Sequence, residues 1–330
     1  MPIYCNLILT RACNLRCKSC GVWKHPSKHC STEEMKRVID KVSKIYNVGH
    51  IGITGGESLQ RDNVYEIIDY ISEKGIFVSI NSNGTLPKEK YQKLLDSKID
   101  NIGISLHFLT PKKQDEFCGM SGAFDKIVKN IRYLRANNSR KFIYVQCTVT
   151  GYNYKEVIKL KKFVNEKLKL PFMITPATWS KEDAIWGVRT CNEGVSKVDT
   201  DFGGIKKELK KFFGMRVMRG KTFLDIAFKQ FETGEKCWNC EAGERYFAVS
   251  PDGRFCICQD IDTNLFILDE KFEEKLRSRK TKKMISKMRD ECSGCTYPCY
   301  LEPQTLKTHP WEVIPLGISH RYNTFRYLMG

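Results

Sequence analysis

The sequence predicts an α/β protein, a partial (β/α)6 barrel followed by a small cysteine-rich β-hairpin and helix extension. Short β-rich runs alternate with longer helical patterns from residue 3 to about 175, as in repeated βα units around a parallel sheet. This rhythm ends after Pro176, and seven cysteines are then concentrated between Cys237 and Cys299. A chain of 330 residues can bury a large core and still carry such an appendage.

The expected strands and helices follow one another along the chain. The strands are 3–9, 50–54, 76–80, 101–106, 142–148 and 172–175, and the helices are 32–46, 63–74, 88–95, 123–136 and 154–168. The first helix is well marked, because Ser31 and Glu34 form an S-x-x-E capping box ahead of an apolar stripe. Right-handed crossovers would curl six such units into an open barrel, with ligands at the carboxyl ends of the strands.

Three regions are expected. Residues 1–176 form the barrel, residues 177–236 a variable connector with helical patterns at 201–215 and 221–232, and residues 237–330 the extension with a C-terminal tail. The extension contains a strand–turn–strand pattern, 246–250 and 254–257, around Pro251-Asp252-Gly253.

The composition restricts the cellular compartment and the kinds of partner that we expect. No apolar run reaches the roughly 18 residues of a spanning helix, and the first ten residues lack the features of a signal peptide. We therefore expect a soluble, cytoplasmic protein with no membrane partner. Fifteen cysteines in a reducing compartment indicate thiolate ligation of metal rather than a disulfide framework.

The net charge of +17 would suit an anionic partner such as RNA. Most lysines, however, fall on amphipathic helix faces, where they are typical of solvated surface. We therefore expect no nucleic-acid partner.

Three cysteines, Cys13, Cys17 and Cys20, follow the first expected strand directly. Their spacing suits three corners of a cubane iron–sulfur cluster on one tight loop. Three protein ligands leave one iron open to bind a small molecule, whereas a four-cysteine cluster is closed. A structural zinc site is the alternative, but zinc takes a fourth ligand.

The arrangement C-x3-C-x2-C after a first strand, with Thr54-Gly55-Gly56-Glu57 ending the second, resembles the radical S-adenosylmethionine (SAM) superfamily. The resemblance implies a [4Fe–4S] cluster on the three cysteines whose open iron chelates SAM. It implies that Gly55 and Gly56 let the backbone approach the methionine amine, which Glu57 contacts. The sequence departs from the family at Ser19, usually aromatic, and at Ser58, often proline.

Further SAM contacts are implied by the same resemblance at later strand ends. Ser82 and Asn83 follow the third expected strand, and Ser105 lies on the fourth. Outside these motifs, His107 and the scattered cysteines are expected to be structural, although Cys118 and Cys191 lie in less regular segments where a substrate could reach them.

The C-terminal cysteines resemble the SPASM or twitch extension of radical SAM enzymes, which carries auxiliary [4Fe–4S] clusters. The resemblance implies one auxiliary cluster on Cys240, Cys258, Cys292 and Cys295; Cys237, Cys256 and Cys299 would be alternates or ligands of a second cluster. A zinc ribbon has the same form, two C-x2-C pairs at a distance, and the spacing does not separate the two.

The implied function is a radical SAM enzyme. An external one-electron donor of the flavodoxin or ferredoxin type would drive cleavage of SAM to a 5′-deoxyadenosyl radical, which abstracts hydrogen from a small-molecule or peptide substrate. An auxiliary cluster favours an oxidation, either dehydrogenation of a small polar molecule or peptide maturation. The alternatives are an RNA-modifying radical SAM enzyme and a non-catalytic iron–sulfur or zinc scaffold.

Overall fold

The computed structural model describes residues 3–25, 27–138, 140–150, 152–176, 220–233, 235–292, 294–309 and 312. Its barrel elements are β1 (Ile3–Thr10), η1 (Val22–Lys24), α1 (Thr32–Ile45), β2 (Val48–Gly55), η2 (Ser58–Gln60), α2 (Val64–Glu73), β3 (Phe77–Ser82), α3 (Lys88–Asp96), β4 (Asn101–Ser105), α4 (Pro111–Cys118), α5 (Ala123–Asn137), β5 (Phe142–Val149), α6 (Val157–Lys162), the π-helix η3 (Phe163–Leu168) and β6 (Phe172–Pro176). The later elements are α8 (Lys221–Thr233), β7 (Tyr246–Val249), β8 (Arg254–Cys258), β9 (Ile261–Phe266), α9 (Phe272–Arg277), α10 (Arg279–Glu291) and α11 (Pro298–Thr308).

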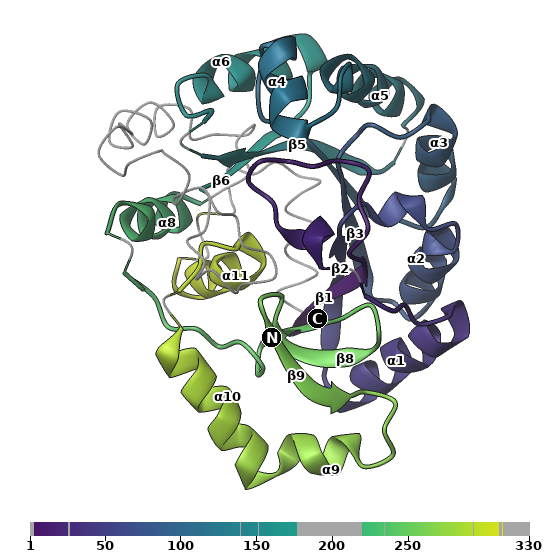
Figure 1. The fold of residues 1–330 in the computed structure, drawn as a ribbon, viewed down its shortest axis with the longest axis vertical. Coiled ribbons are helices and arrows are strands. Elements are labelled where there is room, and N and C mark those ends of the chain that lie inside the picture. The colour runs from purple at the N-terminus through teal and green to yellow at the C-terminus, as the bar shows by residue number, and fades with distance from the viewer. Residues whose placement is uncertain are drawn as a thin grey trace.

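The strands form one nine-stranded sheet in the order β6-β5-β4-β3-β2-β1-β7-β8-β9. Strands β1 to β6 pair in parallel, which confirms the predicted α/β class. The sheet curves without closing, and helices α1 to α6 cover its outer face (Figure 1). The loops that follow the parallel strands therefore meet at one end of the barrel, where a site is expected.

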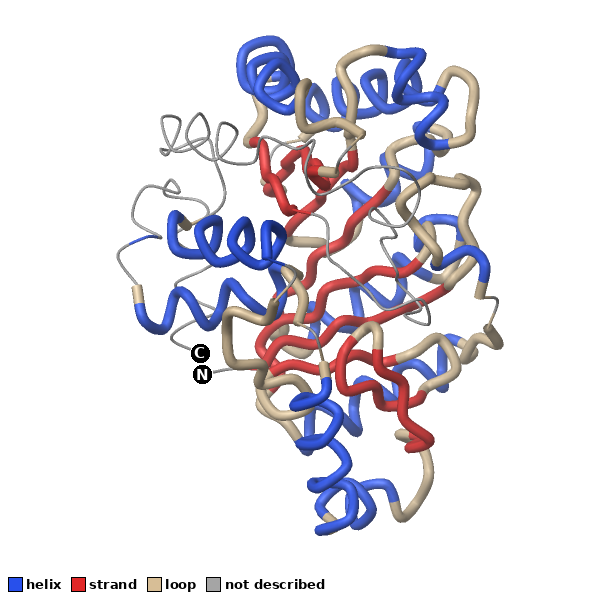
Figure 2. The backbone as a smooth tube through the Cα atoms, turned by 60° about the vertical axis from the view of Figure 1, so that its left-hand side comes forward, coloured by secondary structure: helices blue, strands red, loops and turns tan. Residues whose placement is uncertain are grey.

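The C-terminal hairpin belongs to the same sheet. Strand β7 pairs in parallel with β1, Tyr4 facing Tyr246 and Leu7 facing Val249, while β8 and β9 continue antiparallel. The strand–turn–strand unit expected around Gly253 is thus confirmed, and it lengthens the barrel sheet rather than standing apart from it. In Figure 2 the barrel strands and the hairpin lie in one continuous layer.

The two faces of the sheet differ in chemistry. One large apolar core joins strand residues of the outer face to the helices, for example Leu7, Ile53 and Ile80 to Val38 and Ile67. On the opposite face Ile8, Ala248 and Cys256 form a small separate cluster. Alternation along each strand produces this division.

Most predicted elements are confirmed to within a few residues, and the capping box is present in full, with Ser31 and Glu34 bonding each other's backbone. The sequence analysis did not find α4. Pro111 begins this helix and the left-handed Gly119 follows its end, which are the signals that usually mark the two ends of a helix.

Two other expectations have different outcomes. The helix expected over 154–168 is α6 continued by the π-helix η3, and the helical pattern at 201–215 lies outside the described residues. None of the helices in the described part of the chain combines the length and apolar character needed to cross a bilayer.

Candidate functional site

The loop after β1 carries Cys13, Cys17 and Cys20, all half-buried. Burial and the neighbouring Cys17 and Cys13 raise the pKa of Cys20 to about 12. Burial, Glu57 and Cys17 likewise raise the pKa of Cys13. The three thiols are therefore close enough to disfavour one another's charge, as ligands collected around one cationic group would be before it binds.

The end of α4 holds this loop in place. The backbone N–H groups of Arg16 and Lys18 donate to the carbonyls of Cys118 and Phe117, both at 2.9 Å. The Cys118 thiol is 2% exposed, and its hydrogen bond with Cys17 contributes to the raised Cys17 pKa. Cys118 thus packs behind the cysteine loop, as expected of a structural cysteine, and does not face a substrate. Cys191 lies outside the described residues.

Gly55 and Gly56 join the end of β2 to the cysteine loop. The Gly56 N–H donates to Thr10 O at 2.8 Å and the Glu57 N–H to Ala12 O at 2.9 Å. A Cβ atom would lie 2.1 Å from Thr10 O at Gly55 and 2.0 Å from Ala12 O at Gly56. Both positions thus require glycine so that the cysteine loop can approach; contact of these glycines with SAM stays a prediction.

Glu57 braces the ends of two strands. Its side chain is fully buried; Oε2 accepts from the Asn83 N–H at 2.7 Å and from Ser82 Oγ at 3.1 Å, while Oε1 accepts from the Leu59 N–H at 3.2 Å. Burial raises its pKa to about 7, although these hydrogen bonds oppose the shift. The carboxyl is occupied by internal donors, and its contact with SAM stays a prediction.

Asn83 links the end of β3 to the cysteine loop through a closed set of hydrogen bonds. Its Nδ2 donates to Asn14 Oδ1 at 2.9 Å and lies 3.8 Å from Cys13 Sγ, and its Oδ1 accepts from Thr85 Oγ1 at 2.7 Å. Asn14 Nδ2 donates in turn to Thr85 Oγ1 at 2.9 Å. The sequence analysis missed Asn14 and Thr85, although both are polar residues in loops at strand ends.

Ser105 is the last residue of β4. It follows Ile104, which pairs with Ser82 of β3. Its Oγ accepts from Gln146 Nε2 of β5 at 3.1 Å. His107, two residues on, accepts from the Thr148 N–H on Nδ1 at 3.3 Å. Burial lowers its pKa to about 4 and keeps the ring neutral, in agreement with the expected structural role.

In the extension, Cys240, Cys258, Cys292 and Cys295 influence one another although they come from three segments. Burial raises the pKa of Cys258 well above its usual value, and Asp260, Cys240 and Cys292 add to that rise. Burial, Cys258 and Cys240 do the same for Cys295. The charges of the thiols predicted to hold the auxiliary cluster thus raise the pKa values of Cys258 and Cys295.

The three alternate cysteines, Cys237, Cys256 and Cys299, make other contacts. The buried Cys256 thiol donates to Asp262 Oδ1 at 3.1 Å. A β-bulge between Cys256 and Cys258 breaks the strand alternation, so these two residues do not share surroundings. The Cys237 thiol donates to Glu235 O at 3.2 Å, and Cys299 Sγ accepts from Asn6 Nδ2 at 3.3 Å.

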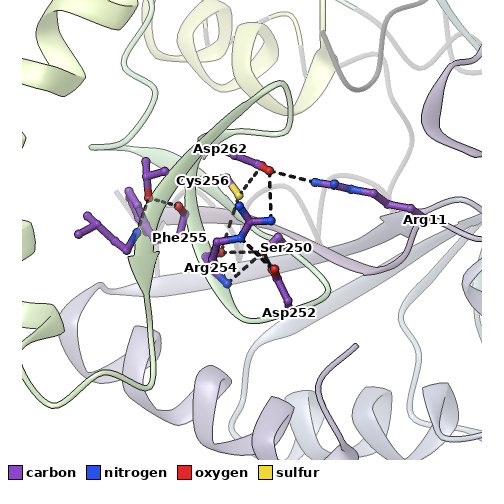
Figure 3. Close-up of polar contacts among 9 residues, drawn as sticks. Arg11, Ser250, Asp252, Arg254, Phe255, Cys256 and Asp262 are labelled. Carbon is purple, nitrogen blue, oxygen red and sulfur yellow. Dashed lines mark hydrogen bonds and ion pairs between the residues drawn. The ribbon is translucent and has the colours of Figure 1, made fainter. Parts of the chain in front are cut away.

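An ion-pair network joins the cysteine loop to the extension (Figure 3). Arg11 lies 3.2 Å from Asp262 of β9, and Arg254 of β8 lies 3.6 Å from the same carboxylate. Arg254 also bonds Asp252 in the hairpin turn, at 2.9 Å. The sequence analysis missed this network, because nothing local relates Arg11 to a strand some 250 residues later.

The predicted ligand sets fit iron–sulfur clusters better than a site for a single metal ion. Among the described residues, no three His, Cys, Asp or Glu side chains meet closely enough to bind a single metal ion. The ligands of a cubane bind separate irons, so they need not converge on one atom. Three mutually close thiols on one loop fit a cluster with an open iron, and four in the extension fit a closed one.

Comparison with known proteins identifies a domain family within the chain. Residues 7–164 match the model of the radical SAM superfamily. The chain is 32% identical over 182 residues to the AdoMet-dependent heme synthase of Nitratidesulfovibrio vulgaris, an alignment covering 52% of this chain and 49% of that protein. It is 30% identical over 172 residues to the antilisterial bacteriocin subtilosin biosynthesis protein AlbA of Bacillus subtilis, covering 50% and 37%. The chain thus spans about half or less of the length of these relatives.

Solved structures extend the likeness beyond the barrel. Streptococcus suis SuiB bound to the precursor peptide SuiA has a TM-score of 0.66, covering 87% of this chain and 67% of that chain at 16% identity. Native anSMEcpe with bound AdoMet and the Cp18Cys peptide has a TM-score of 0.63, covering 92% and 88% at 18% identity. At these identities the likeness concerns the fold. The family match thus identifies residues 7–164 as a radical SAM domain, and the solved structures share the fold of most of the chain.

Proposed function

We propose that this chain is a radical SAM enzyme that oxidatively modifies a peptide. Cys13, Cys17 and Cys20 would hold the SAM-binding [4Fe–4S] cluster, and Cys240, Cys258, Cys292 and Cys295 one auxiliary [4Fe–4S] cluster. The observation that carries the proposal is that β7 pairs with β1, so the cysteine-bearing extension continues the sheet whose first strand leads into the three-cysteine loop. We leave Cys256 out of the ligand set because its thiol is bonded to Asp262.

The protein's part is to hold the cysteine loop rigid. The backbone bonds to α4 support it from one side, and the pairing of Gly56 with Thr10 supports it from the other. The Glu57 carboxyl fixes the neighbouring Ser82–Asn83 loop, so the strand ends that would receive SAM are ordered before it binds.

When bound, the two clusters would supply one-electron chemistry, reductive cleavage of SAM to the 5′-deoxyadenosyl radical at the first and removal of an electron from the substrate at the second. In such an oxidation the substrate would lose one hydrogen atom to the deoxyadenosyl radical, one proton to solvent and one electron to the group that Cys240, Cys258, Cys292 and Cys295 would hold. An external carrier of the flavodoxin or ferredoxin type would deliver the first electron and accept the second. Closed four-thiolate ligation suits the second site to electron transfer alone.

A peptide substrate is supported by the proteins that this chain resembles. SuiB is solved with a precursor peptide and anSMEcpe with the Cp18Cys peptide, and both resemblances cover most of this chain, including its extension. AlbA is a bacteriocin biosynthesis protein. These likenesses favour peptide maturation over dehydrogenation of a small polar molecule.

A tetrapyrrole substrate is a second candidate. The observation that favours it is the 32% identity to an AdoMet-dependent heme synthase. An iron porphyrin bound in the protein would shift the intense visible absorption of the porphyrin, so a titration followed by absorbance separates this candidate from a peptide-modifying enzyme.

The test of the proposal is a metal and product analysis of the anaerobically reconstituted full chain. We expect about eight irons and eight sulfides per chain, four for each cluster, and release of 5′-deoxyadenosine after reduction with dithionite. The triple variant Cys13→Ala, Cys17→Ala, Cys20→Ala should keep about four irons and release no deoxyadenosine. Four irons with retained zinc in the wild-type protein would make the extension a zinc site, and a fully loaded protein without deoxyadenosine would refute the SAM chemistry.

A further inference from the structure

Arg11 links the cysteine loop after β1 to the C-terminal hairpin. It follows the last residue of β1 and precedes Cys13 by two residues, while its guanidinium reaches Asp262 on β9 at 3.2 Å. Figure 3 shows this side chain extending from the cysteine loop toward the hairpin. The residue is 6% exposed.

The guanidinium is unusually short of partners for a buried group. Arginine has five N–H donors, and Arg11 makes one side-chain hydrogen bond, from a terminal nitrogen to Asp262 Oδ2, within the described part of the chain. Its Nε is buried and has no partner among the described residues. Buried donors are rarely left unpaired, and an exception at a charged group requires an explanation such as a water, an ion or a ligand that completes it.

Asp262 cannot satisfy the remaining donors. Its Oδ1 accepts from the Cys256 thiol, and its Oδ2 faces Arg254 at 3.6 Å as well as Arg11. The missing partner should therefore be an acceptor that approaches from outside this network. A carboxylate is the group that matches a guanidinium best, because its two oxygens can take two parallel N–H bonds.

The register of the sheet shows on which face of the sheet Asp262, the partner of Arg11, lies. Asn6, Ala248, Cys256 and Asp262 are successive cross-strand partners on β1, β7, β8 and β9, so their side chains share one face. This is the inner face, since the neighbouring row Leu7, Val249 and Phe255 belongs to the helix-covered core. Arg11 thus reaches the inner face next to the hairpin.

The carboxylate could belong to the methionine part of SAM or to the substrate. The residues predicted to contact SAM lie at the ends of β2, β3 and β4, on one side of β1, whereas Arg11 turns to β9 on the other side. This position favours the substrate.

We propose that Arg11 is a substrate-binding residue whose guanidinium holds a carboxylate of the peptide, with Asp262 orienting it. The inference rests on the proposed peptide-modifying function and names the recognition element of that same site. The carboxylate would be the side chain of an acidic residue or the C-terminus of the peptide.

The experiment uses the anaerobically reconstituted full chain with SAM and two pools of random peptides. One pool contains Asp and Glu and has free C-termini; the other is identical except for Asn, Gln and amidated C-termini. Peptides retained by the protein are identified by mass spectrometry. The wild-type protein should enrich the acidic pool about tenfold, as expected for hydrogen bonds to a charged group.

The variants separate charge, geometry and folding. Arg11→Gln should abolish the enrichment, and Arg11→Lys should reduce it severalfold because lysine keeps the charge and loses the planar fork. Arg245→Gln removes an arginine from a surface pair with Glu241 and should behave as wild type. Iron content and deoxyadenosine release, measured on each variant, report whether it is loaded and folded.

Each outcome is decisive. Equal enrichment in the wild type and in loaded Arg11→Gln, full enrichment in Arg11→Lys, or equal retention of both pools by the wild type would overturn the role of Arg11 and leave the peptide function standing. Retention of neither pool would overturn the peptide function and the inference with it. A tenfold weaker SAM affinity of Arg11→Gln by calorimetry, with peptide selection unchanged, would assign the carboxylate to SAM and overturn the substrate assignment.

Discussion

The backbone N–H of Asn83 lies 2.7 Å from Oε2 of Glu57, so a buried carboxyl at the end of β2 orders the loop after β3. That loop in turn carries the Asn83 side chain to Asn14, next to the first cluster cysteine. The geometry of the cysteine loop therefore depends on a group that does not itself touch the thiols. This dependence has a consequence for stability.

The contribution of Glu57 to the stability of the metal-free protein should fall as the pH rises through its titration, whereas the buried His107, whose pKa is lowered, contributes the opposite slope. Burial raises the pKa of Glu57 from 4.5 to about 7. Between those values Glu57 binds more protons in the native state than in the unfolded state, so its contribution to the free energy of unfolding decreases with rising pH and levels off above about 7. The full loss is on the order of 3 kcal/mol. Urea unfolding at several pH values, under reducing conditions, measures it.

Two variants serve as the test and the control of that measurement. The pH dependence of Glu57→Gln should differ from that of the wild type by this loss between pH 5 and 8. Glu34→Gln alters an exposed capping carboxyl whose pKa is lowered by its Ser31 contacts, so it titrates below this window and should keep the wild-type slope. Parallel curves for wild type and Glu57→Gln would contradict the assignment.

A methyl group at Gly56 should disrupt the cysteine loop. Its Cβ would lie 2.0 Å from Ala12 O, and overpacking of this kind costs about 1–3 kcal/mol. Thermal unfolding of Gly56→Ala should show that loss, and its iron loading should fall. Gly75→Ala is the matched control: φ is +73° and the added Cβ meets nothing within 4 Å, so it should cost about 1 kcal/mol of backbone strain and load iron normally. Normal loading of Gly56→Ala would show that the loop tolerates displacement.

Substitution of Cys240 and substitution of Cys256 should have different effects on the iron content. Cys240→Ala should lose about four irons, because it removes one of four ligands of the auxiliary cluster. Cys256→Ala should retain the wild-type iron content, because the Cys256 thiol is bonded to Asp262. Iron and sulfide analysis of the two reconstituted variants decides the point. Loss of iron from Cys256→Ala would return that residue to the ligand set.

Cys17 and Cys118 should form a disulfide when the metal-free protein is treated with oxidised glutathione. The Arg16 and Lys18 N–H bonds to Cys118 and Phe117 flank Cys17 and hold the two thiols side by side. Peptide mapping by mass spectrometry should detect the pair, and Cys118→Ala should lack it while keeping its iron-binding capacity. Exclusive pairing within Cys13, Cys17 and Cys20 in the wild type would contradict this geometry.

Much of the barrel follows from local sequence. The helix over Thr32–Ile45 was predictable because its cap and apolar stripe lie within one short segment. The three cysteines after β1 and the glycine pair after β2 were predictable as a site because parallel strands bring their carboxyl ends to one edge. The reason for the glycines was less accessible: the approach of Thr10 and Ala12 is visible only once β1 and β2 are paired.

The sequence by itself determined the βα alternation, the cysteine loop and the hairpin, because each depends on periodicity or spacing between near neighbours. Only the tertiary structure decided that the hairpin joins β1, that the bulge separates Cys256 from Cys258, and that Arg11 meets Asp262. These contacts join residues from distant parts of the chain, and a strand's partner and register depend on the packing of the whole sheet. No pattern within either segment records such a pairing.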